Sequence, residues 1–295
     1  MAAKQKIDWA DATWNPVTGC LHGCEYCYAR RIAERFRARE IYDPECQCQR
    51  HLIARGMLKG TGKPLELDYP WEQRNKDGSI TNAAYPFGFE PTFHRYKLDE
   101  PKRWTKPRTI FVCSMADLFG DWVPDEWIQE VFQACEAAPW HRYLFLTKNP
   151  TRLCKMANAY VIRKWNAKHQ KPHDQTDEYE GVLPLPVHDN WWFGSSLDNA
   201  NARRFDGGFT WNTFTSIEPL TEYMDMGIGS FGSDKWTIIG AETGNRNGKV
   251  IPKREWVENI LEAASITSMK VFMKESIREL MGNDFRQELP WEELS

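Results

Sequence analysis

Residues 18–28 read Thr18-Gly19-Cys20-Leu21-His22-Gly23-Cys24-Glu25-Tyr26-Cys27-Tyr28. Cys20, Cys24 and Cys27 follow the spacing C-x3-C-x2-C. Three thiolates this close together can hold one face of an iron–sulfur cluster. A four-iron cluster then keeps one iron without a protein ligand, just as a catalytic zinc site keeps one open position. The spacing therefore predicts a metal site at which chemistry takes place.

The loop resembles the signature of the radical S-adenosylmethionine (radical SAM) superfamily, including the aromatic Tyr26 before the third cysteine. The run from Ile7 to Cys20 resembles a phage-associated branch of that superfamily whose function is unassigned. Four later segments also resemble this branch: residues 111–119, 145–150, 216–220 and 238–244. The resemblance covers nearly the whole chain except about residues 40–89.

The resemblance implies a 4Fe-4S cluster on Cys20, Cys24 and Cys27, with the open iron binding the amino and carboxylate groups of S-adenosyl-L-methionine (SAM). One electron, from a flavodoxin- or ferredoxin-like donor, would split a carbon–sulfur bond and give methionine and a 5′-deoxyadenosyl radical. This radical would abstract hydrogen from an unknown substrate, for which a nucleic acid is one candidate. Such chemistry belongs to the cofactor, while the protein supplies position and a dry site.

Composition and charge exclude several classes of protein. The 295 residues are 41% hydrophobic, which is enough for a packed core. A net charge of −3 argues against a surface that binds nucleic acid everywhere, although a local basic patch stays open. No apolar run approaches the roughly 20 residues of a membrane span. The N-terminus lacks a secretory signal, so we expect a cytoplasmic protein whose clustered cysteines bind metal rather than form disulfides.

Short apolar runs alternate with helical periods, which predicts an α/β fold with a parallel sheet. We expect strands near residues 11–17, 109–113, 143–147, 191–195, 213–217, 235–240 and 269–273, and helices near 29–36, 124–135 and 256–264. This succession, together with the resemblance, predicts a partial or near-complete (β/α) barrel of the radical SAM type, with about six to seven parallel strands. We predict a single domain over residues 1–295, with an insertion at 40–89 after the first helix and a second polar excursion at about 163–190.

Polar residues follow the predicted strands, at the ends where barrel enzymes carry their active sites. Many members of the superfamily have a Gly-Gly-Glu run that contacts the SAM amino group. This chain has Ser114-Met115-Ala116-Asp117 instead, so the resemblance leaves Ser114 or Asp117 as the substitute. We expect Ser195 or Ser196 to contact the ribose, with Asn199 as a second candidate. The catalytic candidates are Lys148, Glu218, Glu242 and Lys274. If Glu218 and Glu242 lie close together, they need a cation or a shared proton.

Three alternatives stay open. His22 could complete a Cys3His zinc site. Cys46 and Cys48, with His51, could bind a second metal, or they could be two exposed loop thiols. Arginines after the cysteine loop and the basic, aromatic segments at residues 94–97 and 102–108 could follow a phosphate backbone. The alternative function is a nucleic-acid-binding protein with a structural zinc or iron–sulfur site and no SAM turnover.

Overall fold

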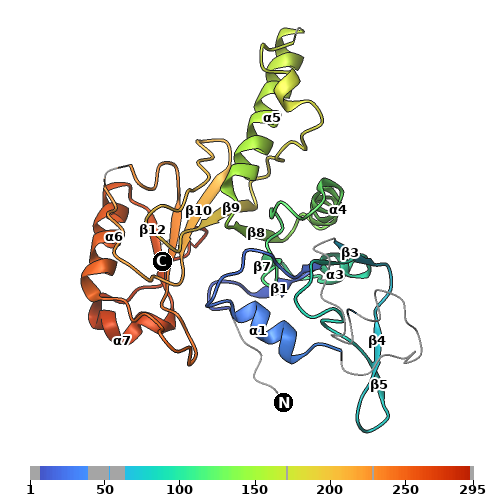
Figure 1. Cartoon of the computed structure of the whole chain (residues 1–295). Helices are drawn as coiled ribbons and strands as arrows, with labels where there is room; N and C mark the ends of the chain where they lie inside the picture. The colour runs from blue at the N-terminus through green and yellow to red at the C-terminus, as the bar shows by residue number, and fades with distance from the viewer. Residues whose placement is uncertain (1–6, 39–52, 54–63, 171, 228, 293–295) are drawn as a thin grey trace. The chain divides into compact units, whose positions relative to one another are not determined.

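The computed structural model describes residues 7–38, 53, 64–170, 172–227 and 229–292 (Figure 1). The chain divides into two compact units. The N-terminal unit comprises Thr13–His141, and the C-terminal unit comprises Arg142–Ser295 together with Met1–Ala12. Each unit is described by itself below.

Seven strands form the main sheet, in the order β1-β7-β8-β9-β10-β11-β12. The strands are parallel, and helices occur in the connections, so the predicted α/β class and strand number are confirmed. In the C-terminal unit the register aligns Thr147 with Ser195, Ser216 with Ser196 and Ile217 with Ile239. The carboxyl ends of neighbouring strands therefore lie side by side along one edge of this part of the sheet.

The main-sheet strands of the N-terminal unit are β1 (Ala12–Trp14) and β7 (Thr109–Val112). The predicted strand at residues 11–17 is divided, because Pro16 has no N–H to donate and the chain turns there into β2 (Val17–Thr18). The Asn15 carboxamide oxygen accepts hydrogen bonds from Ser114 Oγ and Met115 N instead. The α-helices of this unit whose bounds lie within the described residues are α1 (Tyr28–Arg35), α3 (Glu100–Arg103) and α4 (Asp125–Glu136).

A second sheet with the order β2-β6-β3 covers part of the same unit. It contains β3 (Leu65–Leu67) and β6 (Thr92–His94), and β4 (Glu72–Arg74) with β5 (Ile80–Asn82) forms a separate hairpin. The part of the predicted insertion that is described, residues 64–89 and Ile53, therefore adds no strand to the parallel sheet. Cys46, Cys48 and His51 lie outside the described residues.

The strands of the C-terminal unit are β8 (Arg142–Thr147), β9 (Trp191–Ser196), β10 (Asn212–Ile217), β11 (Trp236–Ile239) and β12 (Lys270–Met273). The helices are α5 (Pro150–His169), α6 (Arg254–Ile266) and α7 (Arg278–Met281). The apolar side of α6, including Val257 and Ile260, packs on Ile217, Ile239 and Val271 of the sheet. This packing forms a core cluster of the C-terminal unit.

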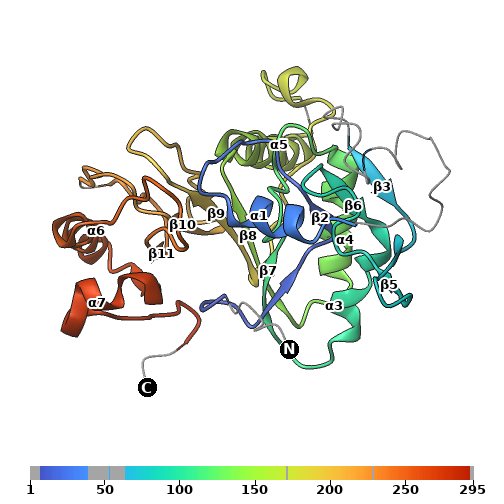
Figure 2. The same cartoon turned by 60° about the horizontal axis from the view of Figure 1, so that its bottom comes forward.

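Strands and helices alternate less regularly in the C-terminal unit than the sequence predicts. Helices follow β8 and β11, whereas the described residues between β9 and β10, and between β10 and β11, contain none. Helix α5 continues to His169, into the stretch predicted as a polar excursion, and its far half extends away from the strands of its unit (Figures 1 and 2). Hydrogen bonds from Asn158 to Tyr179 and from Arg163 to Val182 hold the returning chain against it.

Among the helices of the described segments, none combines the length and apolar character that a membrane crossing requires.

Candidate metal centre and strand-end charges

The cysteine loop, residues 19–27, connects β2 to α1 in the N-terminal unit. Gly19 begins the loop with φ +87° and donates its N–H to Met115 O at 2.9 Å. A Cβ atom at Gly19 would lie 2.2 Å from Glu90 O, so this turn has space only for glycine. Cys27 ends the loop as the N-cap of α1, where its Sγ accepts the Arg30 N–H at 3.3 Å.

The thiols of Cys20, Cys24 and Cys27 are half-buried. Cys20 and Cys27 pack against the small core of Ala29, Ala33, Phe89 and Met115 under α1. The pKa of Cys20 is raised to about 12, chiefly by burial and in smaller part by negative charge on Asp117, Cys24 and Cys27, whereas the hydrogen bond from the His22 backbone N–H lowers it. The three sulfurs are therefore close enough to repel one another as thiolates, and a bound cation would relieve this repulsion by displacing the protons.

The chemistry of this donor set fits an iron–sulfur cluster, because soft thiolates on one short loop are its usual ligands. Within the described ranges, no group of three or more His, Cys, Asp or Glu side chains converges as a ready-made ion site. The assignment of Cys20, Cys24 and Cys27 as cluster ligands accordingly stays a prediction.

His22 is held from outside the loop. Its Nε2 lies 2.7 Å from Asp117 Oδ2, and its ring meets the Trp122 ring edge-on at 4.9 Å. In this geometry only Nδ1 is left for a metal, so the Cys3His alternative would need the imidazole bound through that atom. The pair has no counterpart among the sequence predictions, since His22 and Asp117 are 95 positions apart.

The loop after β7 lies against the cysteine loop. Tyr28 Oη donates to Ser114 O at 2.8 Å, and Asp117, which is 5% exposed, accepts the Phe119 N–H through Oδ1 at 3.0 Å. Ser114 Oγ donates to Asn15. The structure therefore brings both predicted SAM-amino candidates beside the cysteines, each already engaged by hydrogen bonds within the protein.

At the strand ends of the C-terminal unit, each predicted catalytic residue is part of an ion pair. Lys148, after β8, lies 2.7 Å from Asp198, after β9. Lys274, after β12, pairs with Glu218, after β10. Both Nε and Nη2 of Arg246 bind the Glu242 carboxylate, at 2.7 and 2.8 Å. Glu218 and Glu242 are thus each paired with a different basic side chain, Lys274 and Arg246. Each carboxylate therefore has the charge compensation that two neighbouring carboxylates would require.

Lys274 reaches Glu218 by passing over the end of the strand between them. A Cβ atom at Gly240, the residue after β11, would lie 2.9 Å from Lys274 Cδ. The absence of a side chain at Gly240 therefore leaves room for the lysine stem. Sequence reasoning missed Arg246 and the role of Gly240, although the Glu242–Arg246 spacing of four residues in a Gly- and Asn-rich loop is a usable signal.

The three predicted ribose contacts differ in accessibility. Ser195 is 1% exposed, and its Oγ accepts the Phe205 N–H at 2.7 Å, so this hydroxyl holds the chain after β9. Ser196 is 9% exposed. The Asn199 side chain donates to Asp198 Oδ1 at 2.8 Å and accepts the Asn201 N–H at 3.0 Å. Asn199, on the exposed loop, is the best placed of the three to meet a ligand.

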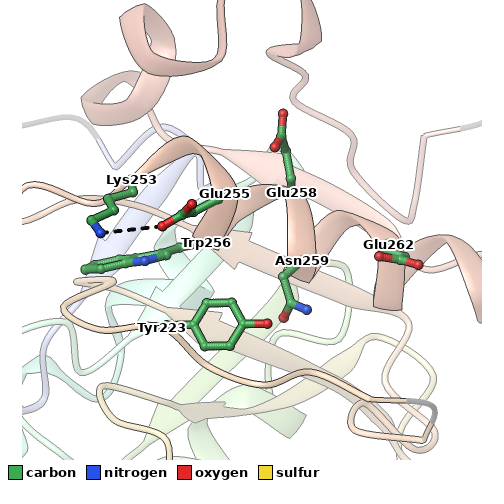
Figure 3. Close-up of a pocket in the computed structure, with 7 residues that line it drawn as sticks. All are labelled: Tyr223, Lys253, Glu255, Trp256, Glu258, Asn259 and Glu262. Atoms are coloured by element: carbon green, nitrogen blue, oxygen red, sulfur yellow. Dashed lines mark ion pairs between the residues drawn. The ribbon is translucent and has the colours of Figure 1, made fainter.

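A pocket of about 670 Å³ lies beside α6 (Figure 3). Tyr223 and Trp256 supply its aromatic walls, and Glu255 pairs with Lys253 at 3.5 Å. None of the predicted site residues lines this pocket.

Comparison with known proteins gives one match. No curated protein matches the chain. No solved structure matches it either. Residues 4–277 match a family model described as "Protein of unknown function (DUF5131)".

Proposed function

Because the chain belongs to the DUF5131 family, whose description names no function, we propose an activity from its own residues: a radical SAM iron–sulfur enzyme. The observation that carries this proposal is the set of three half-buried thiols on one loop at a strand–helix junction. Burial raises the pKa of Cys20, and negative charge on Cys24 and Cys27 contributes to that rise, which supports a role for a bound cation.

In this proposal Cys20, Cys24 and Cys27 would hold a 4Fe-4S cluster, and such a cluster would supply the electron for cleavage of SAM to methionine and a 5′-deoxyadenosyl radical. Asp117 keeps His22 and the loop after β7 in position, since its carboxylate binds both. Ser114 and Asp117 are the candidates for the SAM amino group, and Ser196 and Asn199 for the ribose. Half-buried packing of Cys20 and Cys27 on the α1 core limits access of water to the site.

Lys148, Glu218, Glu242 and Lys274 act on the substrate in this proposal. Each charge is held by a partner, so the side chains are fixed before substrate binds and need little reorganisation. The substrate is a molecule with an abstractable hydrogen, and a nucleic acid is one candidate class. An electron carrier of the flavodoxin or ferredoxin type supplies the electron, and the need for reduced thiols favours the cytoplasm.

The test is anaerobic reconstitution with iron and sulfide, followed by elemental analysis and a SAM-cleavage assay on the same sample. We expect about four irons per chain and 5′-deoxyadenosine after reduction. Cys24→Ala should lose the cluster and the cleavage together. Cys154→Ser, a half-buried cysteine on α5, is the matched control and should keep both.

Zinc in place of iron, or a Cys24→Ala variant that retains its cluster and still cleaves SAM, would contradict the proposal. About eight irons would bring Cys46 and Cys48 into a second cluster. Salt-sensitive nucleic-acid binding without SAM turnover would support the alternative of a structural metal site.

A further inference from the structure

An exposed apolar patch adjoins the cysteine loop. Leu21 within the loop, Tyr28 at the start of α1 and Phe36 at its end are 44%, 39% and 51% exposed. Single exposed apolar side chains are ordinary, but three within one loop and two helical turns are a candidate for an interface. We call Leu21, Tyr28, Arg31, Arg35 and Phe36 the α1 face.

The α1 face is basic. Arg31 and Arg35 are both exposed and lie four residues apart on α1, which places them on one side of the helix. Among the described residues, neither guanidinium has a carboxylate partner, and that of Arg35 lies 5.4 Å from the Phe36 ring centre. The whole chain carries a net charge of −3, so this positive face departs from the average surface. Unpaired arginines beside exposed aromatics are typical of interface centres.

The α1 face lies close to the proposed cluster. Cys27 caps α1, and at a rise of about 1.5 Å per residue Arg31 and Arg35 follow it by about 6 and 12 Å along the axis. A protein bound over these residues would bring a redox centre near Cys27. Electron-transfer complexes are typically small and transient, with interfaces below about 1,200 Å², which suits a face only two turns long.

Resting on the proposed function, we infer that the α1 face is the docking surface of an acidic electron-carrier protein that reduces the cluster. In the transfer, the anionic flavin hydroquinone of a flavodoxin gives up one electron and becomes the neutral semiquinone, with no proton released, and the oxidised cluster takes up that electron. A nucleic acid fits this face less well. Its phosphates need a longer basic track, and the apolar Leu21 and Phe36 suit a protein partner.

The experiment compares two reductants on the reconstituted full chain. Cluster reduction is followed by stopped-flow absorbance with reduced flavodoxin and, in parallel, with dithionite, a small reductant that needs no docking surface. For Arg31→Glu/Arg35→Glu we expect the second-order rate with flavodoxin at low salt to fall at least about tenfold. The rate with dithionite should stay unchanged, and the wild-type flavodoxin rate should fall steeply with added salt.

Control variants distinguish the loss of the docking surface from the effect of any change in surface charge. Lys76→Glu reverses an exposed charge on the β4–β5 hairpin of the same unit and should leave both rates unchanged. Arg31→Lys/Arg35→Lys keeps the charge and should keep most of the flavodoxin rate. If the double reversal fails to assemble a cluster, Phe36→Ser tests the same face through its apolar part, with the same expected loss.

The outcomes distinguish this inference from the proposed function. A wild-type chain that holds no iron refutes the proposed function and the docking inference together. An intact cluster reduced by dithionite, with flavodoxin rates equal in wild type, double reversal and Phe36→Ser, overturns docking alone. Salt-sensitive binding of a single-stranded oligonucleotide that the double reversal abolishes, with flavodoxin reduction unaffected, would identify the face as a nucleic-acid surface and also overturn the inference.

Discussion

Gly19 shows how one residue sets the path of the cysteine loop. Its φ of +87° lies in the region that side-chain-bearing residues rarely adopt, and backbone atoms of Glu90 and Pro91 occupy the space a Cβ would need. Gly23 in the same loop has φ +75°, but nothing lies within 4 Å of its missing Cβ. A Cβ added at Gly23 would therefore meet only the cost of the positive φ, whereas a Cβ added at Gly19 would meet that cost and steric overlap as well.

We expect Gly19→Ala to destabilise the protein by about 2–4 kcal/mol, since it combines positive-φ strain with a clash against rigid backbone. Gly23→Ala should cost only about 1 kcal/mol, from the backbone conformation alone. Chemical denaturation of both variants measures the difference. Equal destabilisation by the two substitutions would show that the overlap with Glu90 is relieved without cost.

The ends of β10, β11 and β12 together position one ion pair of the candidate site. Lys274 leaves β12, passes over Gly240 at the end of β11 and pairs with Glu218 at the end of β10. The main-chain hydrogen bond from Lys274 N to Ile239 O, at 2.9 Å, fixes where the side chain begins. The position of this ion pair therefore depends on the absence of a side chain at Gly240.

Gly240→Ala should displace Lys274 from Glu218. The new Cβ would lie 2.9 Å from Lys274 Cδ and 3.3 Å from its Cβ, so the lysine stem must move, while backbone strain is small because Gly240 is not among the positive-φ glycines. We expect the Lys274 amine to become several-fold more reactive toward an acylating reagent, read by mass spectrometry, with a stability change below about 1.5 kcal/mol. Lys148, paired with Asp198, is the internal control and should label as in wild type. Unchanged Lys274 labelling would refute the prediction.

At the level of the whole molecule, the two units contain buried groups whose ionisation has opposite effects on stability. In the N-terminal unit, burial and, to a smaller extent, the Lys97 ammonium lower the pKa of His94 to about 3. Thr18 Oγ1 and Tyr96 Oη bind the two ring nitrogens at 2.9 and 3.2 Å. In the C-terminal unit, burial raises the pKa of Asp234 to about 6, while the Thr215 hydroxyl, the Arg204 guanidinium and Thr213 favour the carboxylate and Asp206 opposes it.

The signs follow from which state binds the proton. Below about pH 6.5 the unfolded chain protonates His94 and the folded chain does not, so the N-terminal unit loses stability as pH falls from about 6.5 toward 3. Asp234 is protonated in the fold at a pH where it ionises in the unfolded chain. Its contribution is therefore complete below about pH 3.8 and is lost as pH rises through about 6.

Hydrogen exchange between pH 4 and 7, corrected for intrinsic rates, should show β6 amides becoming better protected as pH rises. The contribution of Asp234 should make the amides of β10 and β11 less protected as pH rises. Each of the two groups changes the free energy of unfolding by about 1.4 kcal/mol per pH unit within its own pH range. His94→Gln should flatten the first trend, and Asp234→Asn should remove the second contribution. If neither substitution alters the change of amide protection with pH, the pH dependence arises from other groups.

Much of the element order was predictable, for local reasons. Apolar runs such as residues 109–112 and 142–147, bounded by turn residues, predict strands because their hydrophobic pattern and breakers act within a few positions. The cysteine spacing and the polar residues at strand ends were predictable for the same reason, since both patterns lie within a few positions of sequence. The division of the predicted strand at 11–17 has a local cause in Pro16, but the partners of Asn15 at that turn, Ser114 and Met115, were not predictable because they lie about 100 positions away.

The sequence alone thus determined the α/β class, the succession of strands and the three candidate metal ligands. Only the folded chain established which charges meet. Lys274 and Glu218 are 56 positions apart, and His22 and Asp117 are 95 apart. The same holds for Ser195, whose position at a strand end is local information but whose burial under Phe205 is not. Contacts over such separations depend on the path of the whole backbone, which no short window of residues contains.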